Sequence, residues 1–150
     1  MAETLGSLCD KLTIVKLKEW HSADVDRLSS LAAQCKMLQN EIDDFVLSAL
    51  AGETPVERLS FAANKVYKKQ GNELAAVPDG IGNLVAELAK VNCELWHEQE
   101  KVYEFETVPP EEKNRVVKML ALLNLRRNQC IDGIDKSLIG FLSNRPELHS

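Results

Sequence analysis

Nine residues are candidates for binding an anionic ligand, and most of them lie in two segments of the second half of the chain. Arg127 could hold a phosphate or a carboxylate through two parallel hydrogen bonds, in a polar pocket between helices. The same side chains could instead form a buried polar network that fixes the register of the helices. The candidate ligand-binding residues are Lys11, Lys16, Asn92, Trp96, Glu98, Asn124, Arg127, Asn128 and Asp135.

The first of these segments, residues 88–105, predicts an amphipathic helix whose apolar stripe contains a carboxylate, Glu98. A carboxylate is costly to bury unless it is paired or hydrogen-bonded. Glu98 should therefore meet a cation, bind a ligand or lie at the open edge of the stripe. His97 falls on the opposite face of this helix. Because that face is small and partly apolar, we expect the helix to be covered on both sides.

The second segment predicts a helix from Glu111 to Phe141, in which Asn124 and Arg127 stand where a core would hold leucine. Its expected stripe is Val117, Leu120, Asn124, Arg127, Ile131, Ile134, Leu138 and Phe141. The loop between the two helices contains Pro109 and Pro110 and favours an antiparallel hairpin.

In such a hairpin, residues whose numbers add to roughly 216 lie side by side. Asn92 would then lie near Asn124, and Arg127 near Leu88 and Glu87. Glu98 would lie about 13–15 Å along the axis from Arg127, at 1.5 Å per residue. Glu98 and Arg127 are therefore poor partners within the hairpin, and each needs a partner from elsewhere.

The first half of the chain predicts two more long helices, at residues 5–20 and 24–50, with Gly52 ending the second. Thr54 begins a short helix to about Tyr67, and residues 68–80 have the composition of a loop. Strand-like alternation is absent from the sequence. We therefore predict one all-α domain over residues 1–150. It is a four-helix bundle of two helical hairpins, with a short extra helix in the middle connection.

Two short motifs recur and suggest an internal repeat. Trp20-His21 returns as Trp96-His97, and Ile42-Asp43 returns as Ile134-Asp135. Each half then reads as a helix, a Trp-His pair, a linker and a second helix. If the halves are related by a pseudo-twofold axis, Lys16 could meet Glu98 or Glu87, or stand with Arg127 around an anion.

Composition narrows the functional classes. The chain has 150 residues and a net charge of −5, which argues against broad nucleic-acid binding. No apolar run is long enough to span a membrane, and the N-terminus lacks the pattern of a secretory signal. The four cysteines are far apart and show no zinc-site spacing. We expect reduced thiols and a cytoplasmic protein.

The stretches NCELWHE at 92–98, LNLRRN at 123–128 and IDGID at 131–135 resemble an uncharacterised bacterial family catalogued as a domain of unknown function. The opening DKLTIV at 10–15 is similar to that of the same family. Gln99 departs from the pattern, because the family favours an acid there, and the arginine that often follows is missing. Family members are often encoded near glycosyltransferases for surface polysaccharide, which implies an association and no defined activity.

Metal chemistry is the main alternative to a binding role. Glu94 and His97 have the Glu-x-x-His spacing of di-iron bundles, but Lys18 stands where the repeat would need a second glutamate. Glu94 and Glu98, with Asp132 and Asp135 on the other helix, could bind magnesium in a hydrolase of nucleotides or nucleotide sugars.

We expect a non-catalytic interaction or accessory module without a cofactor, linked to surface-glycan assembly. Its partner would be a second copy of the chain or another protein, with a phosphate- or carboxylate-bearing small molecule as a further ligand. Nucleic acid and membrane are not expected partners. The magnesium-dependent hydrolase is the alternative function.

Overall fold

Four long helices make up most of the chain in the computed structural model, which describes residues 3–60 and 80–144. They are α1 (Leu5–Trp20), α2 (Val25–Leu50), α3 (Ile81–Tyr103) and α4 (Pro110–Asn144). Single 3₁₀ turns occur at η1 (Val56–Arg58) and η3 (Phe105–Thr107). The described residues include no strand, which confirms the predicted all-α bundle.

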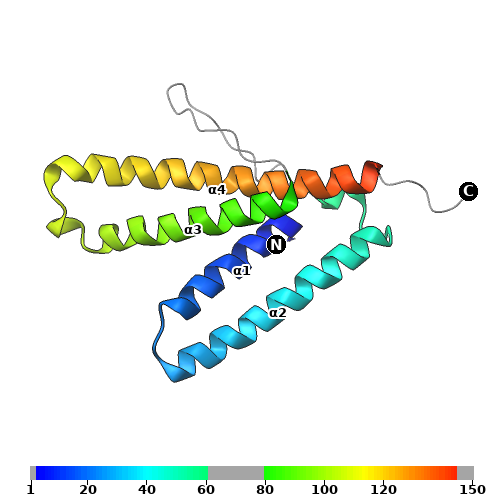
Figure 1. Ribbon diagram of the computed structural model, residues 1–150, viewed down its shortest axis with the longest axis horizontal. Helices are drawn as coiled ribbons and strands as arrows, with labels where there is room; N and C mark the ends of the chain where they lie inside the picture. Colours follow the sequence, from blue (N-terminus) through cyan, green and yellow to red (C-terminus); the bar gives the residue numbers. More distant parts are fainter. Residues whose placement is uncertain (1–2, 61–79, 145–150) are drawn as a thin grey trace, which may run out of the picture.

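The helices form two antiparallel hairpins, α1 with α2 and α3 with α4 (Figure 1). Helix α1 packs on both α3 and α4, whereas α2 packs mainly on α1. Figure 1 shows the α1–α2 hairpin running at an angle to the α3–α4 pair, with the blue and cyan helices diverging from the green and orange ones. The surface of α2 that faces away from α1 is consequently covered by little else in the described chain.

Local signals in the sequence set the ends of the first two helices. The Thr4 side chain accepts a hydrogen bond from the Ser7 N–H, and the Ser7 side chain caps Thr4 in return, so α1 begins with a capping box. The Asp24 side chain accepts from the Arg27 N–H at 3.1 Å and caps α2. Gly52 adopts φ = +76° just after α2, as glycine often does past a helix end.

The apolar core is divided into two clusters. The larger joins all four helices and includes Leu5, Leu84, Leu88, Ile134 and Leu138. The smaller lies between α1 and α2 and has only three buried members, Val15, Leu31 and Cys35. Because burial of apolar area is the main favourable term in folding, the larger cluster should dominate the stability of the fold.

The predicted register of the second hairpin is close to the observed one. Leu84 lies against Gly133, and Glu87 forms an ion pair with Arg126 at 2.5 Å. Both pairs fall within a few residues of the predicted alignment. The partner of Glu87 is therefore the residue before the expected Arg127.

The predicted apolar stripe of α4 is wrong in its first half. Val116 and Leu123 are buried there, whereas Val117 and Asn124 are exposed. A strict alternation of three and four residues drifts by about 20° per heptad relative to a straight helix. At 3.6 residues per turn, Val116 lies about five full turns before Ile134 and therefore on the same face, whereas Val117 lies about 100° away from that face.

Phe141 is exposed although it keeps to the buried face. Gly133 contacts Leu84 in the first turn of α3, and Phe141 lies about two turns beyond Gly133 on α4. Because α3 begins at Ile81, it does not extend far enough to cover Phe141.

The prediction that α3 is covered on both sides is also wrong for the described residues. His97 and Ala86 are exposed there. Of the short helix predicted from Thr54, the structure shows the 3₁₀ turn Val56–Arg58 only, and the rest of that prediction lies outside the described residues, as does the predicted loop. Within residues 3–60 and 80–144, none of the helices has the length and apolarity that crossing a membrane requires.

Candidate functional site

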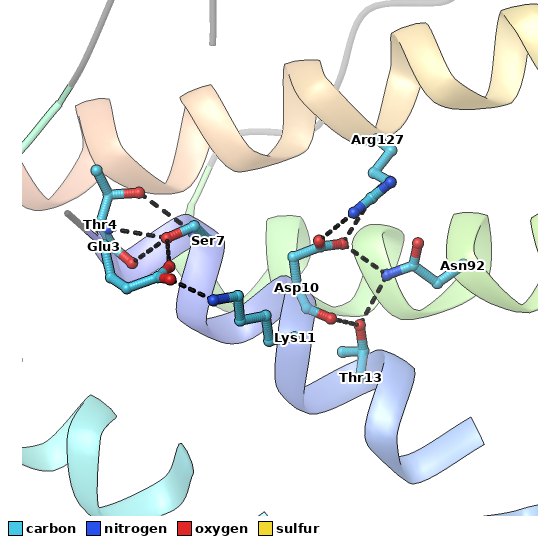
Figure 2. A network of polar contacts seen from close by, with 8 residues as sticks. All are labelled: Glu3, Thr4, Ser7, Asp10, Lys11, Thr13, Asn92 and Arg127. Atoms are coloured by element: carbon cyan, nitrogen blue, oxygen red, sulfur yellow. Dashed lines mark hydrogen bonds and ion pairs between the residues drawn. The ribbon is translucent and has the colours of Figure 1, made fainter. Parts of the chain in front are cut away.

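Arg127 on α4 and Asp10 on α1 form a bidentate ion pair (Figure 2). Arg127 Nε donates to Asp10 Oδ1 at 2.8 Å, and Nη2 donates to Oδ2 at 2.5 Å. The Asp10 side chain is buried, while that of Arg127 is 32% exposed. Hydrogen bonding to this carboxylate raises the pKa of the Arg127 guanidinium. The pair thereby ties the first helix to the last.

Asn92 on α3 completes the network. Its Nδ2 donates to Asp10 Oδ1 at 2.9 Å and to Thr13 Oγ1 at 2.8 Å. The Thr13 hydroxyl in turn donates to the Asp10 backbone carbonyl at 2.8 Å. Asn92 is buried, so both hydrogens of its amide are used inside the protein (Figure 2). Three helices therefore meet at one carboxylate.

The ion pair with Asp10 limits the ability of Arg127 to bind a ligand. Its guanidinium edge is the kind of group that recognises a carboxylate or a phosphate, and in the structure Asp10 of the same chain fills that edge. Of the two interpretations of the polar residues, the geometry favours a buried network that fixes the register of the helices. An anion at this place would have to displace Asp10.

Lys11 and Lys16 lie outside the network. Lys11 forms an ion pair with Glu3, next to the Ser7 and Thr4 side chains that cap α1 (Figure 2). Lys16 pairs with Glu19, one turn along the same helix, at 3.2 Å. Both lysines are exposed.

The predicted meeting of Lys16 with Glu98, Glu87 or Arg127 is therefore wrong. Glu98 pairs with Lys101 on its own helix at 3.2 Å, and Glu87 pairs with Arg126. The Glu98 carboxylate meets a cation, as one of the alternatives for it required. That cation comes from the next turn of α3 and not from another helix.

Asp135 forms a second buried polar site, next to the start of α1. Its Oδ1 accepts from the Gly6 N–H at 2.8 Å, and its Oδ2 is buried without a partner among the described residues. Burial raises the pKa of Asp135 to about 6, against the opposing effects of Gly6 and the Thr4 side chain. The charged and neutral forms of this carboxyl group are therefore in balance at about pH 6 and not at about pH 4.

Trp96 takes part in an aromatic contact between the end of α1 and the C-terminal half of α3. The His21 imidazole stacks on the Trp96 indole with ring centroids 4.7 Å apart and planes 9° apart. The His97 ring lies edge-on to the same imidazole, with ring centroids 6.2 Å apart. The two Trp-His pairs therefore lie side by side, with Trp20 itself 85% exposed. Whether they reflect an internal repeat remains a prediction.

Asn124 and Asn128 are exposed and lie outside the polar network. Asn124 was expected in the apolar stripe, and the drift of that stripe along α4 explains the error. The two residues that periodicity missed are Asp10 and Thr13. Both belong to the opening DKLTIV, but the periodicity of one helix does not show which side chains of other helices face it.

The carboxylates considered for magnesium do not converge. Glu94 lies 3.9 Å from Lys90, Glu98 pairs with Lys101, and Asp135 faces Gly6. Within the described part of the chain, no three or more histidine, cysteine, aspartate or glutamate side chains are grouped in a way that could hold a metal ion.

Comparisons of the chain with models of protein families, with curated proteins and with solved structures give no match. The family resemblance of the polar motifs accordingly remains a prediction.

Proposed function

We propose that this protein is a non-catalytic interaction module whose polar interior holds its helices in place and whose surface binds a protein. The observation that carries this proposal is the closed network at Asp10. The arginine best suited to binding a ligand is already paired, and its carboxylate partner is buried and also held by Asn92. Such a network specifies the arrangement of helices and leaves recognition to the surface.

The surface supports the same proposal. Large apolar side chains are exposed at both ends of α2, in its middle and at the ends of α1 and α3, which is where partners commonly bind. They include Trp20, Val25, Met37, Leu47 and Tyr103. The partner would be a second copy of this chain or another protein. The resemblance of the polar motifs favours a role in surface-glycan assembly, and the free cysteines favour a cytoplasmic setting.

A hydrolysis assay tests the absence of catalysis. We expect the purified protein, supplied with magnesium, to release no phosphate or pyrophosphate above background from a panel of nucleotides and nucleotide sugars. The variant Glu98→Gln should behave identically. Metal-dependent release that Glu98→Gln abolishes would overturn the proposal and establish the magnesium-dependent hydrolase in its place.

A further inference from the structure

A groove of about 400 Å³ runs between α1 and α2 on the side away from the Asp10 network. Its floor is apolar and includes Ile14, Leu38 and Met37. Met37 is 62% exposed, so the groove presents a large apolar side chain to water. The floor is therefore a surface that another molecule could cover with a gain in buried apolar area.

The two rims of the groove differ in charge. The α1 rim carries Lys11 and Lys18, and the α2 rim carries Gln34 and Glu41. Lys11 pairs with Glu3 in the same chain, whereas Lys18 forms no ion pair with any residue that the structure describes. Such a groove favours an occupant that places acidic side chains against the α1 rim and basic side chains against the α2 rim.

The register of the α1–α2 hairpin places these rim residues at matching heights. The Cys35 thiol donates to Glu19 Oε1 at 2.9 Å, and Leu12 and Leu38 pack against the same small cluster. In this antiparallel alignment Lys18 lies level with Gln34. Lys11 and Glu41 lie seven residues from Lys18 and Gln34 on their respective helices, and they are therefore level with each other as well.

We propose that the groove seats a second copy of this chain, through a twofold axis parallel to α1 and α2. This proposal rests on the proposed function and names the partner. Rotation about that axis preserves height and exchanges the rims, so Lys11 meets Glu41 of the other copy and Lys18 meets its Gln34. A twofold axis across the helices would instead place α1 on α1 and lysine against lysine.

The result is an antiparallel four-helix arrangement of two α1–α2 hairpins. It gives the groove face of α2 a second helix to pack on, whereas within the described residues α2 packs mainly on α1. Lys11 would bridge Glu3 of its own chain and Glu41 of the other.

The size of the surface indicates a weak dimer. A helix of 16 residues is about 24 Å long, and two helices side by side are about 20 Å wide, so the face measures roughly 500 Å² in projection. Stable complexes commonly bury about 800 Å² of accessible surface on each partner. We therefore expect a dissociation constant of roughly 1–100 µM.

Sedimentation equilibrium of the full chain tests the dimer and its position. The wild type should change from monomer to dimer between about 1 and 500 µM. Met37→Glu places a carboxylate on the apolar floor and should weaken association at least tenfold. Leu47→Glu is the matched control, because Leu47 is equally exposed at 64% on the same helix but lies outside the groove. It should associate like the wild type. Circular dichroism checks that both variants keep their helices.

A second pair of variants tests the charge register. Glu41→Lys and Asp43→Lys change the net charge equally, and both positions are exposed on α2, but only Glu41 lines the groove. Either change lowers the general repulsion between copies that carry a charge of −5. Glu41→Lys should nevertheless weaken association, because it sets lysine against Lys11, while Asp43→Lys should leave it equal or stronger.

A wild type that stays monomeric to about 500 µM would overturn the second-copy proposal. So would equal effects of Met37→Glu and Leu47→Glu, which would locate the contact elsewhere, or an unchanged Glu41→Lys. The hydrolysis assay does not depend on association, so its result is independent of these outcomes. Failure of the dimer and failure of the proposed function are therefore distinguishable.

Discussion

At the scale of single residues, Asp10 is the side chain on which the polar interior depends. It accepts hydrogen bonds from Arg127 on α4 and from Asn92 on α3, so it links elements that lie far apart in the sequence. The sequence indicated that Arg127 needed a partner from outside its own hairpin. It could not indicate which partner, because the pairing spans 117 positions and helical periodicity describes one helix at a time.

Removing the cation of this pair should be costly. Arg127→Ala leaves the buried Asp10 carboxylate with Asn92 and without its counter-ion. Breaking a buried pair in this way costs about 3–5 kcal/mol, and partial exposure of Arg127 lowers the expectation to roughly 2–4 kcal/mol of unfolding free energy. Urea denaturation followed by circular dichroism measures it.

The matched control is Arg115→Ala, at an exposed arginine of the same helix, which should cost less than about 0.5 kcal/mol. In the double variant with Asp10→Ala, the loss should be smaller than the sum of the two single losses. If Arg127→Ala cost no more than Arg115→Ala, the network would not hold the helices together.

Asp135 gives the fold a pH dependence of predictable sign. Its pKa is raised from 3.8 to about 6 by burial, so the folded state binds more protons than the unfolded state between these values. Its contribution therefore lowers the free energy of unfolding as the pH rises from about 4 to about 6, and the penalty is complete above that range.

Asp135→Asn should remove this penalty. The amide oxygen can still accept from Gly6, and one unpartnered polar atom remains in either case. At pH 8 we expect the variant to be more stable than the wild type by on the order of 1–3 kcal/mol, with the difference vanishing near pH 4. Asp44→Asn, at an exposed site, should change stability by less than about 0.5 kcal/mol. A difference for Asp135→Asn that does not vary with pH would contradict the assignment.

At the scale of elements, the ends of α1 and α2 were predicted closely, whereas α3 begins at Ile81 and not at the predicted Leu88. The packing faces were predicted less well. The predicted bounds of α1, residues 5–20, are confirmed, because a capping box starts this helix and an apolar stripe follows it. The stripe of α4 failed at Val117 and Asn124. A strict seven-residue repeat drifts around a straight helix, so over the 35 residues of α4 it no longer follows the buried face.

The contact of α1 with α4 depends on Gly6. A Cβ atom at this position would lie 2.3 Å from the Ile131 carbonyl oxygen, which is backbone and cannot turn aside. Gly6→Ala should therefore push the two helices apart and cost about 1–3 kcal/mol or more, measured by thermal denaturation.

Gly140→Ala, in the interior of α4 with open space around the new methyl group, should instead leave stability unchanged or raise it by up to about 1 kcal/mol. Equal behaviour of the two alanine variants would show that α1 does not approach α4 as closely as the structure has it.

At the scale of the whole molecule, the two clusters predict unequal stability. The cluster between α1 and α2 has three buried residues, and the cluster shared by the four helices has nine. Local opening is easier where fewer apolar contacts are lost. The α1–α2 hairpin should therefore open before the α3–α4 hairpin.

The reactivity of two buried thiols can show which hairpin opens first, without any mutation. Burial raises the pKa of both Cys35, in the small cluster, and Cys130, in the large one, to about 11. Because their chemistry is matched, their alkylation rates should differ mainly through opening of the fold. We expect Cys35 to be labelled faster in low urea at pH 8, as measured by peptide mass spectrometry at low protein concentration. Equal rates would mean that both hairpins open together.

The stack of His21 on Trp96 supplies this protein with an intrinsic optical sensor. Because the His21 ring stacks on the Trp96 indole, the emission of Trp96 should change whenever the end of α1 leaves α3. Trp20, which is largely in water, contributes a constant red-shifted emission beside it. Detachment of the first hairpin could thus be followed in real time by light alone, in the unlabelled chain.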